Sequence, residues 1–142
     1  MQKNNDIKRI VGYFKGRKEV SALYLFGSLA NGGARRESDI DLAVLIDEKL
    51  MEKKSFNRLK NDYYQASPAF SLRSVDIVIL NTASLPLRHR ILKTGKILFD
   101  RNRKFRVDFT TKSIIRYLDF KPIEDIFRKA VADRFRRASV GR

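Results

Sequence analysis

The chain has 142 residues, which is enough for one domain with a single hydrophobic core but not for two independent ones. Hydrophobic residues make up 43% and charged residues 33%, and there is no cysteine. This composition excludes a disordered chain, a collagen-like chain and a disulfide scaffold. The apolar runs are too short to span a bilayer, and the polar start MQKNNDIKRI is unlike a signal peptide. We therefore expect a cytoplasmic protein with no membrane partner.

The charge is strongly positive, with 31 Lys and Arg against 16 Asp and Glu, a formal net charge of +15. Residues 1–100 carry 18 basic and 11 acidic groups, a net +7, whereas residues 101–142 carry 13 and 5, a net +8. The last third is thus more than twice as positive per residue. Such a balance attracts polyanions, which include nucleotide phosphates, RNA, DNA and acidic proteins. Charge alone does not choose among them.

The first half of the chain predicts a helix and then two strands. Apolar residues recur at helical spacing within residues 4–18. The runs ALYLF (residues 22–26) and IDLAVLI (residues 40–46) are typical of buried strands, and a small, polar, glycine-containing stretch, residues 27–38, separates them. A second amphipathic helix is expected between residues 51 and 66.

The second half predicts two further strands and more helix. The run VDIVIL (residues 75–80) indicates a third strand, and KILF (residues 96–99) a short fourth one. Between them, residues 84–95 form a helix that a serine caps and a glycine ends. From about residue 103 the pattern is helical, and we expect Lys121-Pro122 to divide it into two helices. The prediction is a single α+β domain.

The chemistry is concentrated between the first two strands. Gly27 permits a sharp turn whose N–H groups can approach a phosphate, and the Ser28 hydroxyl adds a donor beside it. Residues two apart in a strand face the same way, so Asp39 and Asp41 project their carboxylates together. Two adjacent carboxylates at the edge of an apolar strand repel each other, and a divalent cation such as Mg²⁺ relieves that repulsion.

A third acid, Asp76, interrupts the otherwise apolar strand VDIVIL. If this strand pairs beside the second one, Asp76 reaches the same site. It then either completes a two-metal arrangement or acts as general base on an attacking hydroxyl.

Gly27-Ser28, ten residues, and then Asp39-Ile40-Asp41 form the pattern GS-x10-DxD. This pattern resembles the signature of the polymerase-β-like nucleotidyltransferase superfamily, and Asp76 matches the third carboxylate of that superfamily. The segments PLRHRILKTGKILFD and YLDFKPIEDIF are similar to parts of the minimal nucleotidyltransferases (MNT), the antitoxin half of HEPN/MNT toxin–antitoxin pairs. The resemblance therefore covers nearly the whole chain.

The resemblance implies a small mixed β-sheet packed with helices, with residues 1–100 as the catalytic core of the single domain 1–142. It also implies a Mg²⁺-dependent enzyme in which an acceptor hydroxyl attacks the α-phosphate of ATP. Gly27 and Ser28 would hold the outer phosphates, and Asp39 and Asp41 would bind the metal together with Asp76. The implied acceptor is a tyrosine of a HEPN toxin, whose adenylylation silences that RNase.

The roles of the other polar residues in the loop and helices are less clearly indicated by the sequence. Arg36 and Ser38, next to Arg35, are candidates for contact with the triphosphate or the metal, although a solvated basic loop is an equal alternative. His89 has no second histidine or cysteine to form a zinc site, so a packing or surface role is favoured.

The basic segment 101–137 is expected to form C-terminal helices that dock onto a toxin, giving a hetero-oligomer. A merely solvated helix face is the alternative, and direct nucleic-acid binding is not favoured because no RNA-binding motif is present. Two other functions stay open for the whole chain. It could neutralise a partner by non-catalytic complex formation, or transfer nucleotides to a small molecule or to RNA.

Overall fold

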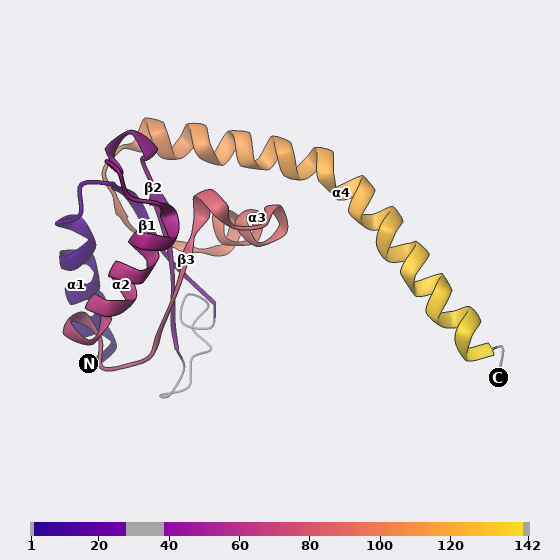
Figure 1. Ribbon diagram of the computed structural model, residues 1–142, viewed down its shortest axis with the longest axis horizontal. Coiled ribbons are helices and arrows are strands. Elements are labelled where there is room, and N and C mark those ends of the chain that lie inside the picture. Colours follow the sequence, from indigo (N-terminus) through magenta and orange to yellow (C-terminus); the bar gives the residue numbers. More distant parts are fainter. Residues whose placement is uncertain (1, 28–38, 141–142) are drawn as a thin grey trace.

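The computed structural model describes residues 2–27 and 39–140, and its core is a four-stranded mixed sheet (Figure 1). The strands are β1 (Val20–Phe26), β2 (Ile40–Ile46), β3 (Val75–Ile79) and β4 (Lys96–Asp100), in the spatial order β3-β2-β1-β4. β1 pairs antiparallel with β2 and β4, whereas β2 and β3 are parallel. The predicted α+β class and the mixed sheet are confirmed.

Apart from Ser21 and Asp41, the two central strands are apolar because both faces of the sheet are covered (Figure 1). Helices α1 (Gln2–Lys15) and α2 (Phe56–Phe70) pack on one face, around a cluster that includes Phe14, Leu23 and Tyr63. Helices α3 (Leu85–Thr94) and α4 (Arg103–Val140) cover the other face, around Tyr24, Leu45 and Ile91. Two short 3-10 turns, Glu48–Leu50 and Leu80–Thr82, follow β2 and β3.

Local sequence accounts for the helix boundaries. Ser55 caps α2, where its hydroxyl accepts from the Arg58 N–H at 3.1 Å. Ser84 caps α3 in the same way, and Gly95 follows its last residue. Helix α2 begins and ends a few residues later than predicted and contains Pro68 near its end.

The predicted division of the C-terminal segment into two helices is wrong, because α4 is one helix that includes Pro122. A proline inside a helix removes one hydrogen bond and crowds the preceding turn, and a helix tolerates it by bending. Figure 1 shows α4 curving along its length. The bend is accommodated there because no residue from Leu118 to Ser139 is buried, so a change of direction at Pro122 disturbs no core packing.

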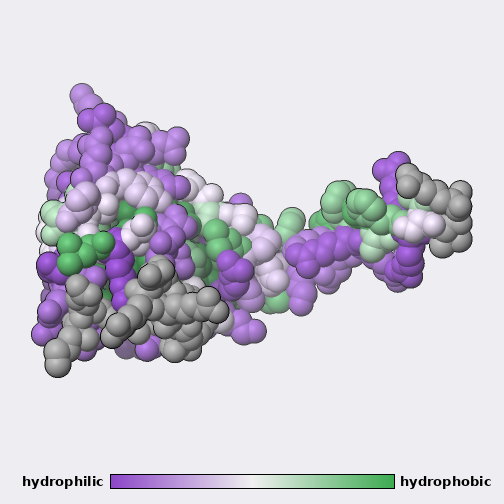
Figure 2. Space-filling model, turned by 90° about the horizontal axis from the view of Figure 1, so that it is seen from below, coloured by the Kyte–Doolittle hydropathy of each residue, from purple (hydrophilic) through white to green (hydrophobic). Residues whose placement is uncertain are grey.

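The two ends of α4 lie in different environments. Near its start, Phe105 and Phe109 pack against the core and Ser113 is buried. From Leu118 to Ser139 no residue is buried, and this part of the helix stands clear of the body (Figure 2). No helix in the described ranges combines the length and the apolar character needed to cross a bilayer.

Candidate functional site

The end of β1 turns at Gly27, whose φ of +75° lies in the left-handed region that glycine favours. Phe26 is paired with Asp41 across the β1–β2 ladder. A Cβ added at Gly27 would lie 2.2 Å from Asp41 Oδ2. The absence of a side chain at Gly27 therefore lets the Asp41 carboxylate lie directly against the backbone at the strand end.

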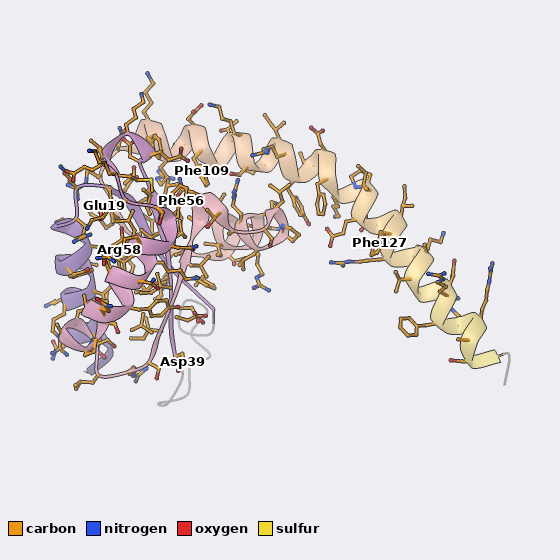
Figure 3. All side chains as sticks on the ribbon, viewed as in Figure 1. Glu19, Asp39, Phe56, Arg58, Phe109 and Phe127 are labelled. Carbon is orange, nitrogen blue, oxygen red and sulfur yellow. The ribbon has the colours of Figure 1, made fainter. Side chains whose placement is uncertain are left out.

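The predicted pairing of β2 with β3 brings Asp41 and Asp76 together. The strands are parallel and in register, with Asp41 opposite Asp76. Asp41 is half-buried, whereas Asp76 is exposed, as is Asp39 just before β2. Figure 3 shows Asp39 at the edge of the body where β2 begins. Burial raises the pKa of Asp41 above its usual range, and the charges of Asp76 and then Asp39 raise it further.

Tyr64 of α2 orients Asp76, a contact that sequence reasoning missed. Its hydroxyl donates to Asp76 Oδ1 at 2.9 Å and accepts from the Ile77 N–H at 2.8 Å. One carboxylate oxygen of Asp76 is thus held by the protein. Burial raises the pKa of Tyr64, and the Asp76 carboxylate raises it further, so the phenol stays protonated as a donor. The helical periodicity of residues 51–66 predicts an amphipathic helix but gives no sign of the role of Tyr64.

The donor set suits a hard divalent cation. Within residues 2–27 and 39–140, none of Asp39, Asp41 and Asp76 forms an ion pair with Lys, Arg or His. Over the same ranges, no three His, Cys, Asp or Glu side chains are arranged to hold a metal ion. The structure therefore pairs Asp41 with Asp76 and leaves Asp39 exposed beside them. Carboxylate oxygens without a protein cation are the ligands that Mg²⁺ takes together with phosphates and waters.

The remaining loop residues lie outside the described part of the chain. This applies to Ser28, Arg36 and Ser38, the predicted phosphate and metal contacts, and to Arg35 beside them. Of the predicted phosphate turn, the structure describes Gly27.

A cavity of about 450 Å³ opens beside Asp41, between the ends of the central strands and α3. Phe26, Gly27 and Asp41 line one side of it, and Arg90, Ile91 and Thr94 of α3 line the other. Sequence reasoning missed the α3 side. No signal in the sequence indicated it, because the antiparallel pairing of β4 with β1, which brings the end of α3 next to the Gly27 turn, is a tertiary feature.

His89 takes the packing role that the sequence favoured. Its ring stacks on Tyr117 of α4, with the ring centroids 3.9 Å apart. The stack ties α3 to the first half of α4 and places His89 on the side of α3 that faces α4 rather than the acids.

The fold and this site define a nucleotidyltransferase. Residues 8–104 match the family described as polymerase beta, nucleotidyltransferase, and the chain belongs to this family. The protein adenylyltransferase MntA of Shewanella oneidensis is 28% identical over 145 residues, covering 99% of this chain and 100% of the relative. The predicted membership of the minimal nucleotidyltransferase group is confirmed.

Solved structures agree with this assignment. The crystal structure of a toxin–antitoxin with AMP-PNP matches with a TM-score of 0.72 and 26% identity, over 89% of this chain and 98% of the other. A tri-AMPylated Shewanella oneidensis HEPN toxin in complex with MNT antitoxin matches with a TM-score of 0.67 and 27% identity, over 93% and 99%. Both matches include most of α4 as well as the catalytic body, because they cover about nine-tenths of this chain.

Proposed function

We propose that the chain is an antitoxin that transfers AMP from ATP to a tyrosine hydroxyl of a HEPN-family toxin and thereby neutralises it. The observation that carries the proposal is the in-register pair Asp41–Asp76 beside the Gly27 turn. The relatives support the substrate and the acceptor class. One is a protein adenylyltransferase, one was solved with AMP-PNP, and one accompanies a tri-AMPylated HEPN toxin.

In the reaction, the acceptor oxygen forms a bond to the α-phosphorus, the bond from that phosphorus to the outer phosphates breaks, and pyrophosphate leaves. The N–H groups at the Gly27 turn bind the outer phosphates, and Ser28, Arg36 and Ser38 of the following loop add donors. Asp76 orients the acceptor hydroxyl and accepts its proton as general base. One Asp76 oxygen is available for this, because the Tyr64 hydroxyl bonds to the other. Catalysis of this kind is mainly positioning and charge stabilisation.

Asp39, Asp41 and Asp76 are the residues that would hold Mg²⁺. The cation would neutralise charge on the triphosphate and on the leaving pyrophosphate. The raised pKa of Asp41 supports the assignment, because a half-buried carboxylate between two others is electrostatically unfavourable until a cation joins them.

The exposed half of α4 supports docking onto a protein partner. Five apolar side chains here are each 55–70% exposed, namely Ile115, Leu118, Ile123, Ile126 and Phe127. The last three lie three and four residues apart and form an apolar stripe on one face of the helix. Exposed apolar side chains grouped on a projecting helix are typical of a protein interface. Residues 101–142 carry a net charge of +8, which favours a partner with an acidic rim over a second copy of this chain.

Intact-mass spectrometry of the HEPN-family partner tests the proposal, after incubation with this protein, ATP and Mg²⁺. We expect added mass in whole AMP units, lost when the acceptor tyrosine is changed to Phe. The double variant Asp39→Asn/Asp41→Asn should abolish the addition. The matched control is Asp108→Asn, which removes an exposed carboxylate paired with Lys112 on α4.

Two outcomes would contradict the proposal. A partner that is neutralised with no added mass would establish inhibition by complex formation alone. Labelled AMP that appears on RNA or on a small molecule, and not on the partner, would keep the chemistry and replace the acceptor.

A further inference from the structure

Helix α3 presents its charged side chains to two different environments. Arg88 is buried, where its Nη2 donates to the Asn81 carbonyl at 2.9 Å and its guanidinium lies over the Phe109 ring. His89 stacks on Tyr117. Arg90, by contrast, is exposed and lines the cavity beside Asp41. Two of these side chains therefore hold α3 against its neighbours, and the third faces the site.

Arg90 has no carboxylate partner among the residues that the structure describes. Its guanidinium donates no hydrogen bond to another described residue, and its backbone carbonyl accepts from the Thr94 hydroxyl at 2.7 Å. A guanidinium that borders a cavity and forms no ion pair there is available for a bound anion.

The position of α3 relative to the site is closely defined. A Cβ added at Gly95, just after the helix, would lie 2.6 Å from the Ile91 carbonyl oxygen and 3.3 Å from that of Leu25 in β1. The residue after Gly95, Lys96, is paired with Leu25 in the sheet. The end of α3 is thus fitted against the same strand that leads into Gly27, so Arg90 is held at a defined place opposite the acids.

We propose that the Arg90 guanidinium binds a phosphate group of the nucleoside triphosphate, facing Asp41 across the cavity. The inference rests on the proposed function, since it uses the same substrate. The cavity of about 450 Å³ has the size of a small-molecule site. Asp41 on the sheet side repels the triphosphate unless a cation intervenes, and Arg90 is the described cation on the opposite wall. Charge that builds up on the leaving pyrophosphate is stabilised by a donor fixed there in advance.

Calorimetric titration of the full chain with Mg²⁺-ATP and with adenosine tests the role of Arg90. For Arg90→Ala we expect the Kd for Mg²⁺-ATP to rise about tenfold or more, with a smaller rise for Arg90→Lys, which keeps the charge but loses the two-pronged geometry. Adenosine binding should not change. The control is Lys93→Ala, an exposed cation on α3 that does not line the cavity. In the transfer assay, Arg90→Ala should raise KM for ATP.

Equal binding of Mg²⁺-ATP by Arg90→Ala and wild type would overturn the inference, and so would an equal loss of adenosine affinity, which indicates a structural role. The two proposals fail separately. Arg90-dependent binding of ATP by a wild-type protein that modifies no partner would keep the phosphate contact and refute the transfer reaction.

Discussion

The sheet body and the free half of α4 use apolar side chains in opposite ways. In β1 and β2 almost every residue is buried, whereas from Leu118 to Ser139 no residue is (Figure 2). In Figure 3, Phe109 lies where α4 crosses the body and Phe127 lies on the part that projects from it. The body holds Asp41 and Asp76 in place by internal contacts, whereas the apolar side chains of the free half are exposed. The proposed chemistry and the proposed docking therefore fall to separate regions of one short chain.

The largest expected effect separates these two regions. The double variant Ile126→Asp/Phe127→Asp places two charges on the apolar stripe and should weaken the complex with the partner by about 100-fold or more. Pull-down or titration calorimetry measures this, and binding of Mg²⁺-ATP should not change. The control is Arg128→Ala, about 200° round the helix from Ile126. Full retention of the complex would remove α4 from the interface.

The Gly27 turn should be the most sensitive point of the body. Gly27→Ala forces a Cβ onto Asp41 Oδ2 and strains a positive φ, which costs about 1–2 kcal/mol of stability. Displacement of the carboxylate should slow transfer by about 100-fold. Gly12→Ala is the matched control, since nothing lies within 4 Å of its Cβ and alanine stabilises a helix interior by about 0.5–1 kcal/mol. Thermal melts and the mass assay measure both effects.

The two halves of α4 should differ in what they contribute to stability. Phe109→Ala removes a ring that packs on the core beneath Arg88, and should cost about 2 kcal/mol. Phe127→Ala should change the free energy of unfolding by less than about 0.5 kcal/mol, because that side chain is exposed. Urea unfolding of the isolated protein measures both. Equal destabilisation by the two variants would contradict the contrast between the halves.

A smaller effect is expected where α2 supports the site. Tyr64→Phe leaves the Ile77 N–H without its acceptor, at a cost of about 1 kcal/mol. It also frees Asp76, which should slow transfer about tenfold. Tyr63→Phe is the control. It loses a 3.0 Å hydrogen bond from the Tyr63 hydroxyl to Glu19, which is not one of the three site carboxylates. That variant should lose stability and keep its transfer rate.

The smallest expected effect is a change in the free energy of unfolding when Asp41 is replaced. The folded state raises the pKa of Asp41, so ionisation of Asp41 favours unfolding, and this penalty appears as the pH rises above the unfolded pKa. In EDTA at pH 7, Asp41→Asn should therefore be more stable than wild type by a few tenths of a kcal/mol, after allowance for solvent screening. The advantage should disappear near pH 3. Thermal melts of both proteins between pH 3 and pH 7 measure this difference. An Asp41→Asn variant that is less stable than wild type at pH 7 would contradict the raised pKa of Asp41.

The sequence by itself determined the elements that depend on local pattern. The residues of β2 were predicted because a strand buried on both faces is a nearly continuous apolar run, and the start of β3 because branched apolar residues are typical of strands. The spacing from Gly27-Ser28 to Asp39 and Asp41 identified the family, since a turn and two acids along one segment need no tertiary information to recognise.

Only the tertiary structure decided the contacts between residues far apart in the chain. The packing of α2 and α3 on the sheet sets the hydrogen bond from Tyr64 to Asp76 and the position of Arg90 opposite Asp41. The sequence could not show these contacts, because side-chain periodicity indicates only which face of a helix is apolar. The same reason explains the error at Pro122. Local propensity predicts a break there, but a helix exposed on both sides of a proline is free to bend and continue.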